Sequence, residues 1–262
     1  MTVDLTGPSA SDDKSSYLHR QTIGALGALL PLLVWLIAGL RPDDGSRTPW
    51  RLLGSMSAYY YTSGVVAFVG VLAALSVYLI IYQGFDNVHG TQDRFTARLA
   101  GVSAAMVALF PTTVDHHPRW LAPWVSYTHY ASATVLFGCL MFFSLVLFTK
   151  SGAASPTRGK QRRNWIYRAC GIAIGICLVS IAALELLGRG DTASIFWPEA
   201  IALWFFALSW LTKGRADHTL LRIAEYTRHP RRLARGLRRN IEKLKGTEPA
   251  RAAIVEIDPS IP

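Results

Sequence analysis

Residues 126–149 read SYTHYASATVLFGCLMFFSLVLFT, without a single Asp, Glu, Lys or Arg. The hydrocarbon core of a bilayer is about 30 Å thick, so a helix needs roughly 20 apolar residues to cross it. Other stretches of the chain are similarly long and apolar, and the predicted spans are residues 22–40, 63–83, 96–114, 126–149, 165–187 and 195–212. The sequence therefore predicts an all-α protein, a polytopic transmembrane helical bundle with six spans.

The composition leaves room for one membrane domain and its tails. Of the 262 residues, 51% are hydrophobic and only 17% are charged, which excludes a sizeable soluble domain. Residues 1–20 are rich in Ser, Asp and Thr and predict a mobile N-terminal tail. Residues 21–212 would form the six-helix domain. Residues 213–262 would form a basic amphipathic tail.

The distribution of Lys and Arg predicts the orientation. Positive charge close to a span resists translocation, so loops rich in Lys and Arg face the cytoplasm. The loop between the fourth and fifth predicted spans is such a loop, with Lys150, Arg158, Lys160, Arg162 and Arg163. With an even number of spans, the N- and C-termini are then both cytoplasmic. The loop over residues 41–62 faces outward although it carries Arg41, Arg47 and Arg51, so the charge rule is not obeyed everywhere.

The segment after the sixth span is strongly basic. Residues 213–245 carry eleven Lys or Arg against three acidic residues, and their apolar residues recur every three or four positions. This pattern is typical of amphipathic helices on a membrane surface, where anionic headgroups attract each cation. Inner-leaflet contacts are expected at Arg228, Arg231, Arg232, Arg235, Arg238 and Arg239. The alternative is a tail that only fixes topology, and no aromatic interleaving predicts nucleic acid as a partner.

Ionisable residues at membrane depth gather near the predicted outer side. Glu185 ends the fifth span, Glu199 begins the sixth and His129 begins the fourth. A charge inside a bilayer is costly unless it is paired or hydrated, so such residues are candidates for function.

A run of tyrosines precedes the second span at the same side. Residues 55–62 read SMSAYYYT, which includes Ser57, Tyr59, Tyr60 and Tyr61. These hydroxyls would line a polar cavity, with Glu185, Glu199 and His129 as its charged floor. An interfacial aromatic belt is the alternative. We expect the cavity to bind or handle a lipid headgroup or a lipid-linked envelope molecule.

Other functions remain open from the sequence. Asp115, His116, His117 and His129 supply ligands for zinc, which would make the site a metal-assisted lipid hydrolase, although adjacent histidines point in different directions on a regular element. An oligomeric channel or transporter is the third interpretation, and Gly171 with Gly175 would provide a close-packing face within or between subunits of a homo-oligomer. Neither a cofactor nor a catalytic residue is predicted.

Four short motifs carry a family resemblance. They are SAYYYT at 57–62, YQGFD at 82–86, FPTT at 110–113 and RNWIYR at 163–168. Over about residues 20–214 the chain resembles an uncharacterised family of bacterial six-helix membrane proteins, distantly similar to the Frag1/DRAM/Sfk1 type. The resemblance implies a six-helix bundle in the bacterial cytoplasmic membrane. It implies no activity, because the family has none to carry over.

Overall fold

The computed structural model describes residues 10–41, 50–84, 90–112, 122–150, 158–188 and 195–215. In this part of the chain every regular element is a helix, and strands are absent. The α-helices are α1 (Ala10–Leu40), α2 (Val65–Ile80), α3 (Gly90–Leu109), α4 (Pro123–Phe142), α5 (Arg158–Leu186) and α6 (Phe196–Lys213). Two short helices accompany them: a 3-10 helix, η1 (Ser57–Tyr61), and a π-helix, η2 (Phe143–Leu147), which continues α4.

The first helix begins before the first predicted span. Helix α1 starts at Ala10, whereas the predicted span starts at residue 22 and residues 1–20 were predicted as a tail. The reason is tertiary packing, because His19 Nε2 donates a hydrogen bond to Tyr78 O at 2.8 Å and Arg20 is only 2% exposed beside Tyr82. His19 and Arg20 therefore pack against α2 and the residues that follow it. The other helices begin and end within a few residues of the predicted spans, except that α3 and α5 start earlier.

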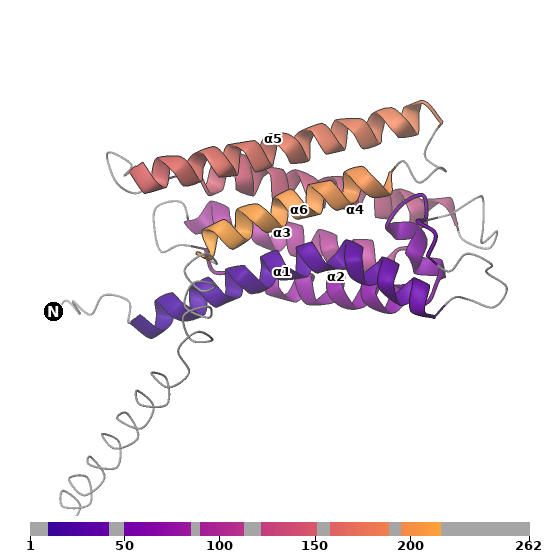
Figure 1. Cartoon of the computed structure of the whole chain (residues 1–262), viewed down its shortest axis with the longest axis horizontal. Coiled ribbons are helices and arrows are strands. Elements are labelled where there is room, and N and C mark those ends of the chain that lie inside the picture. The colour runs from indigo at the N-terminus through magenta and orange to yellow at the C-terminus, as the bar shows by residue number, and fades with distance from the viewer. Residues whose placement is uncertain are drawn as a thin grey trace, which may run out of the picture. The chain divides into compact units, whose positions relative to one another are not determined.

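The helices form a closed ring in chain order. Each α-helix packs against the next one, and α6 returns to pack against α1 (Figure 1). Consecutive helices alternate in direction: His129 near the start of α4 donates to Phe110 O after the end of α3, and Lys160 at the start of α5 donates to Phe148 O after the end of η2. Gln21 in the first half of α1 likewise donates to Gly214 O just after α6. We call the two resulting ends of the ring the Arg20 end and the Glu199 end.

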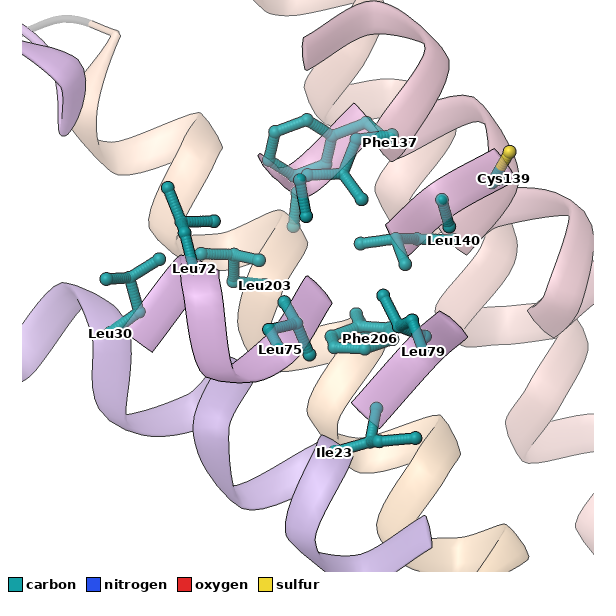
Figure 2. Close-up of a cluster of buried hydrophobic side chains, with 14 of the residues drawn as sticks. Ile23, Leu30, Leu72, Leu75, Leu79, Phe137, Cys139, Leu140, Leu203 and Phe206 are labelled. Carbon is teal, nitrogen blue, oxygen red and sulfur yellow. The ribbon is translucent and has the colours of Figure 1, made fainter. Parts of the chain in front are cut away.

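The centre of the ring is apolar. Figure 2 shows side chains from α1, α2, α4 and α6 meeting there, including Ile23, Leu75, Leu140 and Phe206. All four are fully buried. Burial of each such side chain contributes about 1.5–3 kcal/mol in water, whereas in a bilayer close packing replaces much of that driving force.

Glycines bring several helices into close contact. Gly24 and Gly27 of α1 lie against Leu211 and Phe206 of α6, respectively. Gly171 of α5 lies against Leu145 of η2, so this predicted close-packing residue makes a contact within the subunit. Small residues let helix backbones approach closely, which is the usual way helices associate in membranes.

Three helices of the described chain are long and apolar enough to cross a membrane. They span Ser16–Leu40, Pro123–Leu147 and Arg158–Leu186. Helix α2 is apolar but shorter, and α3 carries Asp93, Arg94 and Arg98. Large apolar side chains also face outward along the ring, for example Val66, Leu109 and Val179. A helical ring with an apolar core and an apolar outer surface is typical of a membrane protein.

Candidate functional site

The segment over residues 50–64 forms a cap on the Glu199 end of the ring. Its short helix η1 is held from α6, because the Met56 N–H donates to Glu199 Oε2 at 2.7 Å. In return, Gly54 O accepts hydrogen bonds from the N–H groups of Ile195 and Phe196 at the start of α6. The first N–H groups of a helix have no hydrogen-bond partner inside the helix, and the Gly54 carbonyl supplies one for α6. The Glu199 side chain in turn holds residues 50–64 in place. We call residues 50–64 the cap segment.

The three adjacent tyrosines of the cap segment have different environments. Tyr59 is 1% exposed, its hydroxyl accepts from the Leu53 N–H at 3.4 Å, and its ring contacts Phe196. Tyr61 is 39% exposed and donates to Thr112 O at 2.6 Å. The Tyr60 ring contacts Tyr61 and Phe68, and its hydroxyl makes no hydrogen bond to a described residue. Burial raises the pKa of Tyr59 and of Tyr61, so both phenols keep their protons at neutral pH.

Hydroxyl groups connect the cap segment to the end of α3. Ser55 and Ser57 share a hydrogen bond of 2.9 Å between their Oγ atoms. Thr112 Oγ1 donates to Ser57 Oγ at 3.3 Å. Both Ser57 and Thr112 are buried. A hydroxyl can donate and accept at once, so this chain of hydroxyls is a hydrogen-bonded network at the edge of an apolar ring.

The predicted charged floor is only partly assembled. Glu185, near the end of α5, is exposed and close enough to Glu199 for electrostatic repulsion between the two carboxylates. His129 is buried and donates from Nδ1 to Phe110 O at 2.6 Å. Among described residues, no hydrogen bond or ion pair joins His129 to either glutamate. The structure therefore brings Ser57, Tyr59 and Glu199 together through Met56, and it leaves His129 beside α3.

The residues of the zinc hypothesis are mostly outside the described part of the chain. Asp115, His116 and His117 are not described, and neither are the six predicted tail contacts, Arg228, Arg231, Arg232, Arg235, Arg238 and Arg239. Within the described ranges, no group of three or more His, Cys, Asp or Glu side chains is arranged to hold a metal.

Two residues that hold the cap segment, Gly54 and Thr112, lie outside the tyrosine-rich run at residues 55–62. Gly54 contributes only its carbonyl oxygen, which no sequence pattern reveals. Thr112 contributes a side chain and a carbonyl oxygen, and it lies 51 residues along the chain from Tyr61. The FPTT motif that contains Thr112 is the one signal in the sequence that points to it.

The fold and the cap segment together define a class: a helical protein with the features of a polytopic membrane protein and a polar cap on one end of its ring. No family model, curated protein or solved structure matches the chain. The function is therefore argued from the site itself.

Proposed function

We propose that the chain is a six-span membrane protein whose Glu199 end faces outward and binds the headgroup of a lipid or of a lipid-linked envelope molecule. The alternation of helix directions supports the topology, since the first half of α1 lies beside the end of α6. The distribution of charge also supports this topology. The basic residues Lys150, Arg158, Arg162 and Arg163 all lie at the Arg20 end, which would be cytoplasmic.

Helix α2 is short and helix α3 is charged, but both are compatible with this topology because other helices pack against them. Helix α3 packs against α2 and α4, and Asp93 and Thr96 at its start are buried inside the ring. A charged residue near a helix end that faces the interior of a bundle is tolerated at lower cost than one facing lipid. The relationship to bacterial six-helix membrane proteins, and location in the cytoplasmic membrane, are part of the same proposal.

One observation carries the proposed binding function. An apolar ring ends in a hydrogen-bonded network of hydroxyls and a carboxylate, formed by Ser55, Ser57, Thr112 and Glu199 with the backbone of Met56. Polar groups concentrated at one end of a membrane domain match the depth of lipid headgroups, which carry hydroxyl, phosphate and amine groups.

The hydrogen bonds of this site support two roles for its residues, holding the cap segment in shape and contacting the ligand. Tyr59, Ser57 and Glu199 make internal hydrogen bonds and so hold the cap segment in shape. The side chains of Tyr60 and Glu185 make no hydrogen bond to a described residue, and Tyr61 is partly exposed. We therefore assign ligand contact to Tyr60, Tyr61 and Glu185, and a positioning role to Tyr59, Ser57 and Glu199.

Native mass spectrometry of protein purified in mild detergent and re-exposed to a total lipid extract of its host membrane tests this assignment. We expect a retained lipid, and we expect Tyr60→Phe or Glu185→Gln to reduce its retention by about fivefold, as loss of one hydrogen bond predicts. Tyr127→Phe is the matched control, because Tyr127 is 71% exposed on α4 at the same end. Equal retention by all four proteins would reject ligand contact at Tyr60 and Glu185.

A further inference from the structure

The outward surface of the ring is apolar over different lengths on different helices. Exposed apolar side chains extend over residues 18–40 on α1 and over residues 165–186 on α5. On α2 they extend only over residues 66–81. A helix rises about 1.5 Å per residue, so these three surfaces are about 33, 32 and 22 Å long, respectively. The surface of α2 is therefore shorter than the hydrocarbon core of a bilayer, which is roughly 30 Å thick.

Helix α3, next to α2, has a short apolar surface too. A Cβ added at Gly101 on α3 would lie 2.7 Å from Ile80 Cγ1, near the end of α2. A Cβ at Gly84, after α2, would lie 2.8 Å from Asp93 Cβ on α3. Because the two helices run in opposite directions, Arg98 between these contacts lies level with the end of α2, and it is exposed. From Arg98 to the last residue of α3 is only about 16 Å.

The apolar surface of α2 falls short at the Glu199 end of the ring. A Cβ at Gly64, just before α2, would lie 2.9 Å from Val34 O, and α1 continues beyond this level to the exposed Leu40. At the Arg20 end, in contrast, the His19 ring of α1 lies 5.9 Å from the ring of Tyr82, just after α2. The two surfaces are therefore level at the Arg20 end, and α1 extends further at the Glu199 end.

The cap segment occupies the level beside the end of α1. Ser63 Oγ donates to Ile37 O at 3.3 Å and to Arg41 O at 2.5 Å. The ring centres of Trp50 and Trp35 lie 5.2 Å apart. Irregular backbone does not face hydrocarbon in membrane proteins, because its N–H and C=O groups need partners. The cap segment therefore needs headgroups or water beside it, at a level where α1 still presents apolar side chains.

Tyr61 lies where the cap segment meets the short apolar surfaces of α2 and α3. It is partly exposed, and its hydroxyl donates to Thr112 O just after α3. The nearest strongly exposed apolar side chains along these helices are Val66 at 69% and Leu109 at 67%. A bilayer next to an apolar surface that is too short thins locally to match it. A phospholipid with its acyl chains on Val66 and Leu109 would then have its headgroup beside Tyr61.

We propose that the bilayer is thinned beside α2 and α3, in the leaflet at the Glu199 end, so that phospholipid headgroups reach Tyr61 from the side of the ring. The partner is a phospholipid of that leaflet. This inference rests on the membrane insertion proposed above and deepens the proposed binding function. It assigns the route of the headgroup, which arrives within the leaflet and not from water.

The test measures the depth of a fluorescent label in dioleoylphosphatidylcholine vesicles through quenching by nitroxide-labelled lipids. The full chain carries one added cysteine, Val66→Cys on α2 or Leu32→Cys on α1. Both positions are exposed, and the contact of Gly64 with Val34 places them level in the ring. The native cysteines are buried, so the label should report the added one.

We expect the label at Val66 to lie at the boundary between headgroups and acyl chains. The label at Leu32 should lie about 6–12 Å deeper, because the exposed Leu36 and Leu40 continue the apolar surface of α1 beyond it. Ala73→Cys is the control that a label on α2 reports depth. Ala73 is exposed on the same helix, and its label should lie about 10 Å deeper than that at Val66.

Equal depths of the labels at Val66 and Leu32 would overturn the proposal, because a flat bilayer covers level positions equally. If Val66→Cys does not fold, Leu109→Cys gives the same reading from α3. A label at Leu109 as deep as that at Leu32 would overturn the proposal as well.

The same vesicles separate this proposal from the binding function of the cap segment. The label depths need no bound headgroup, so Tyr60→Phe and Glu185→Gln should leave them unchanged. A shallow label at Val66 in a protein that retains no lipid would reject the binding function alone, and equal depths with lipid retained would reject the thinning alone. Labels outside the hydrocarbon at both Val66 and Leu32 would reject membrane insertion and with it both proposals.

Discussion

Single positions decide how closely the helices of this ring approach each other. A Cβ at Gly101 on α3 would lie 2.7 Å from Ile80 Cγ1 and 2.8 Å from Ser76 O, both on α2. The second contact is to backbone, which cannot rotate away. Gly70 on α2, in contrast, has no atom within 4 Å of an added Cβ. The two glycines therefore separate a packing effect from a helix-propensity effect.

Gly101→Ala should lower the free energy of unfolding by about 1–3 kcal/mol, because the methyl group forces α2 and α3 apart. Gly70→Ala should raise it by about 0.5–1 kcal/mol, because alanine loses less backbone freedom in a helix. Unfolding in detergent micelles measures both. Changes of the same sign and size would contradict the close approach at Gly101.

A second contact between individual residues lies in the buried interior. Ser144 in η2 donates to Ser209 Oγ at 2.9 Å, and both side chains are fully buried. The π-helix brings this hydroxyl toward α6, as π-turns often do at special sites in helices.

A double-mutant cycle of Ser144→Ala and Ser209→Ala should give a coupling energy of about 0.6 kcal/mol, the usual size of a hydrogen bond between membrane helices. The same unfolding assay measures it. A coupling energy of zero would show that the two hydroxyls do not interact in the folded protein.

Among the elements, the cap segment depends most on its neighbours. A single turn of 3-10 helix has little stability of its own. Here it is held by Glu199 of α6 through Met56 and by Thr112 after α3 through Tyr61. The cap segment should therefore be the first part to loosen when one of these contacts is removed.

Glu199→Ala should destabilise the protein by about 1–3 kcal/mol, because the buried Met56 N–H loses its partner. Glu199→Gln keeps a carbonyl oxygen in the same place and should restore most of that loss. Glu185→Ala is the control, since the Glu185 side chain is exposed and makes no hydrogen bond to a described residue. Equal destabilisation by both alanine variants would exclude the cap contact as the cause.

The described ring of helices has different chemistry at its two ends. The Arg20 end carries most of the described basic residues, and the Glu199 end carries the cap segment with its tyrosines. This difference follows from the alternation of helix directions, which sends every second connection to the same end.

Cysteine labelling tests the topology. We expect Arg51→Cys to react with a membrane-impermeant maleimide in intact cells, and Arg158→Cys to react only after permeabilisation, because the positions lie at opposite ends of the ring. Both arginines are exposed, and the native cysteines Cys139, Cys170 and Cys177 are buried, so background labelling should be low. Labelling of both positions from one side would contradict the proposed spans.

The sequence by itself determined the helical class and much of where the helices lie. Long apolar stretches such as residues 126–149 leave a backbone in lipid no option but to form helices, and the spacing of charge and proline then fixes their limits approximately. It also indicated Glu199 and the tyrosines of the cap segment, because glutamate at membrane depth and three adjacent tyrosines are rare in apolar surroundings.

Tertiary structure alone decided which of these residues meet. Met56 and Glu199 lie 143 positions apart, and Arg20 and Tyr82 lie 62 positions apart, so neither contact leaves a local pattern in the sequence. The same is true of His19 and Tyr78, whose hydrogen bond joins α1 to α2 across 59 positions of the chain. Helix formation depends on neighbours along the chain, whereas a site depends on how packed helices bring distant side chains together.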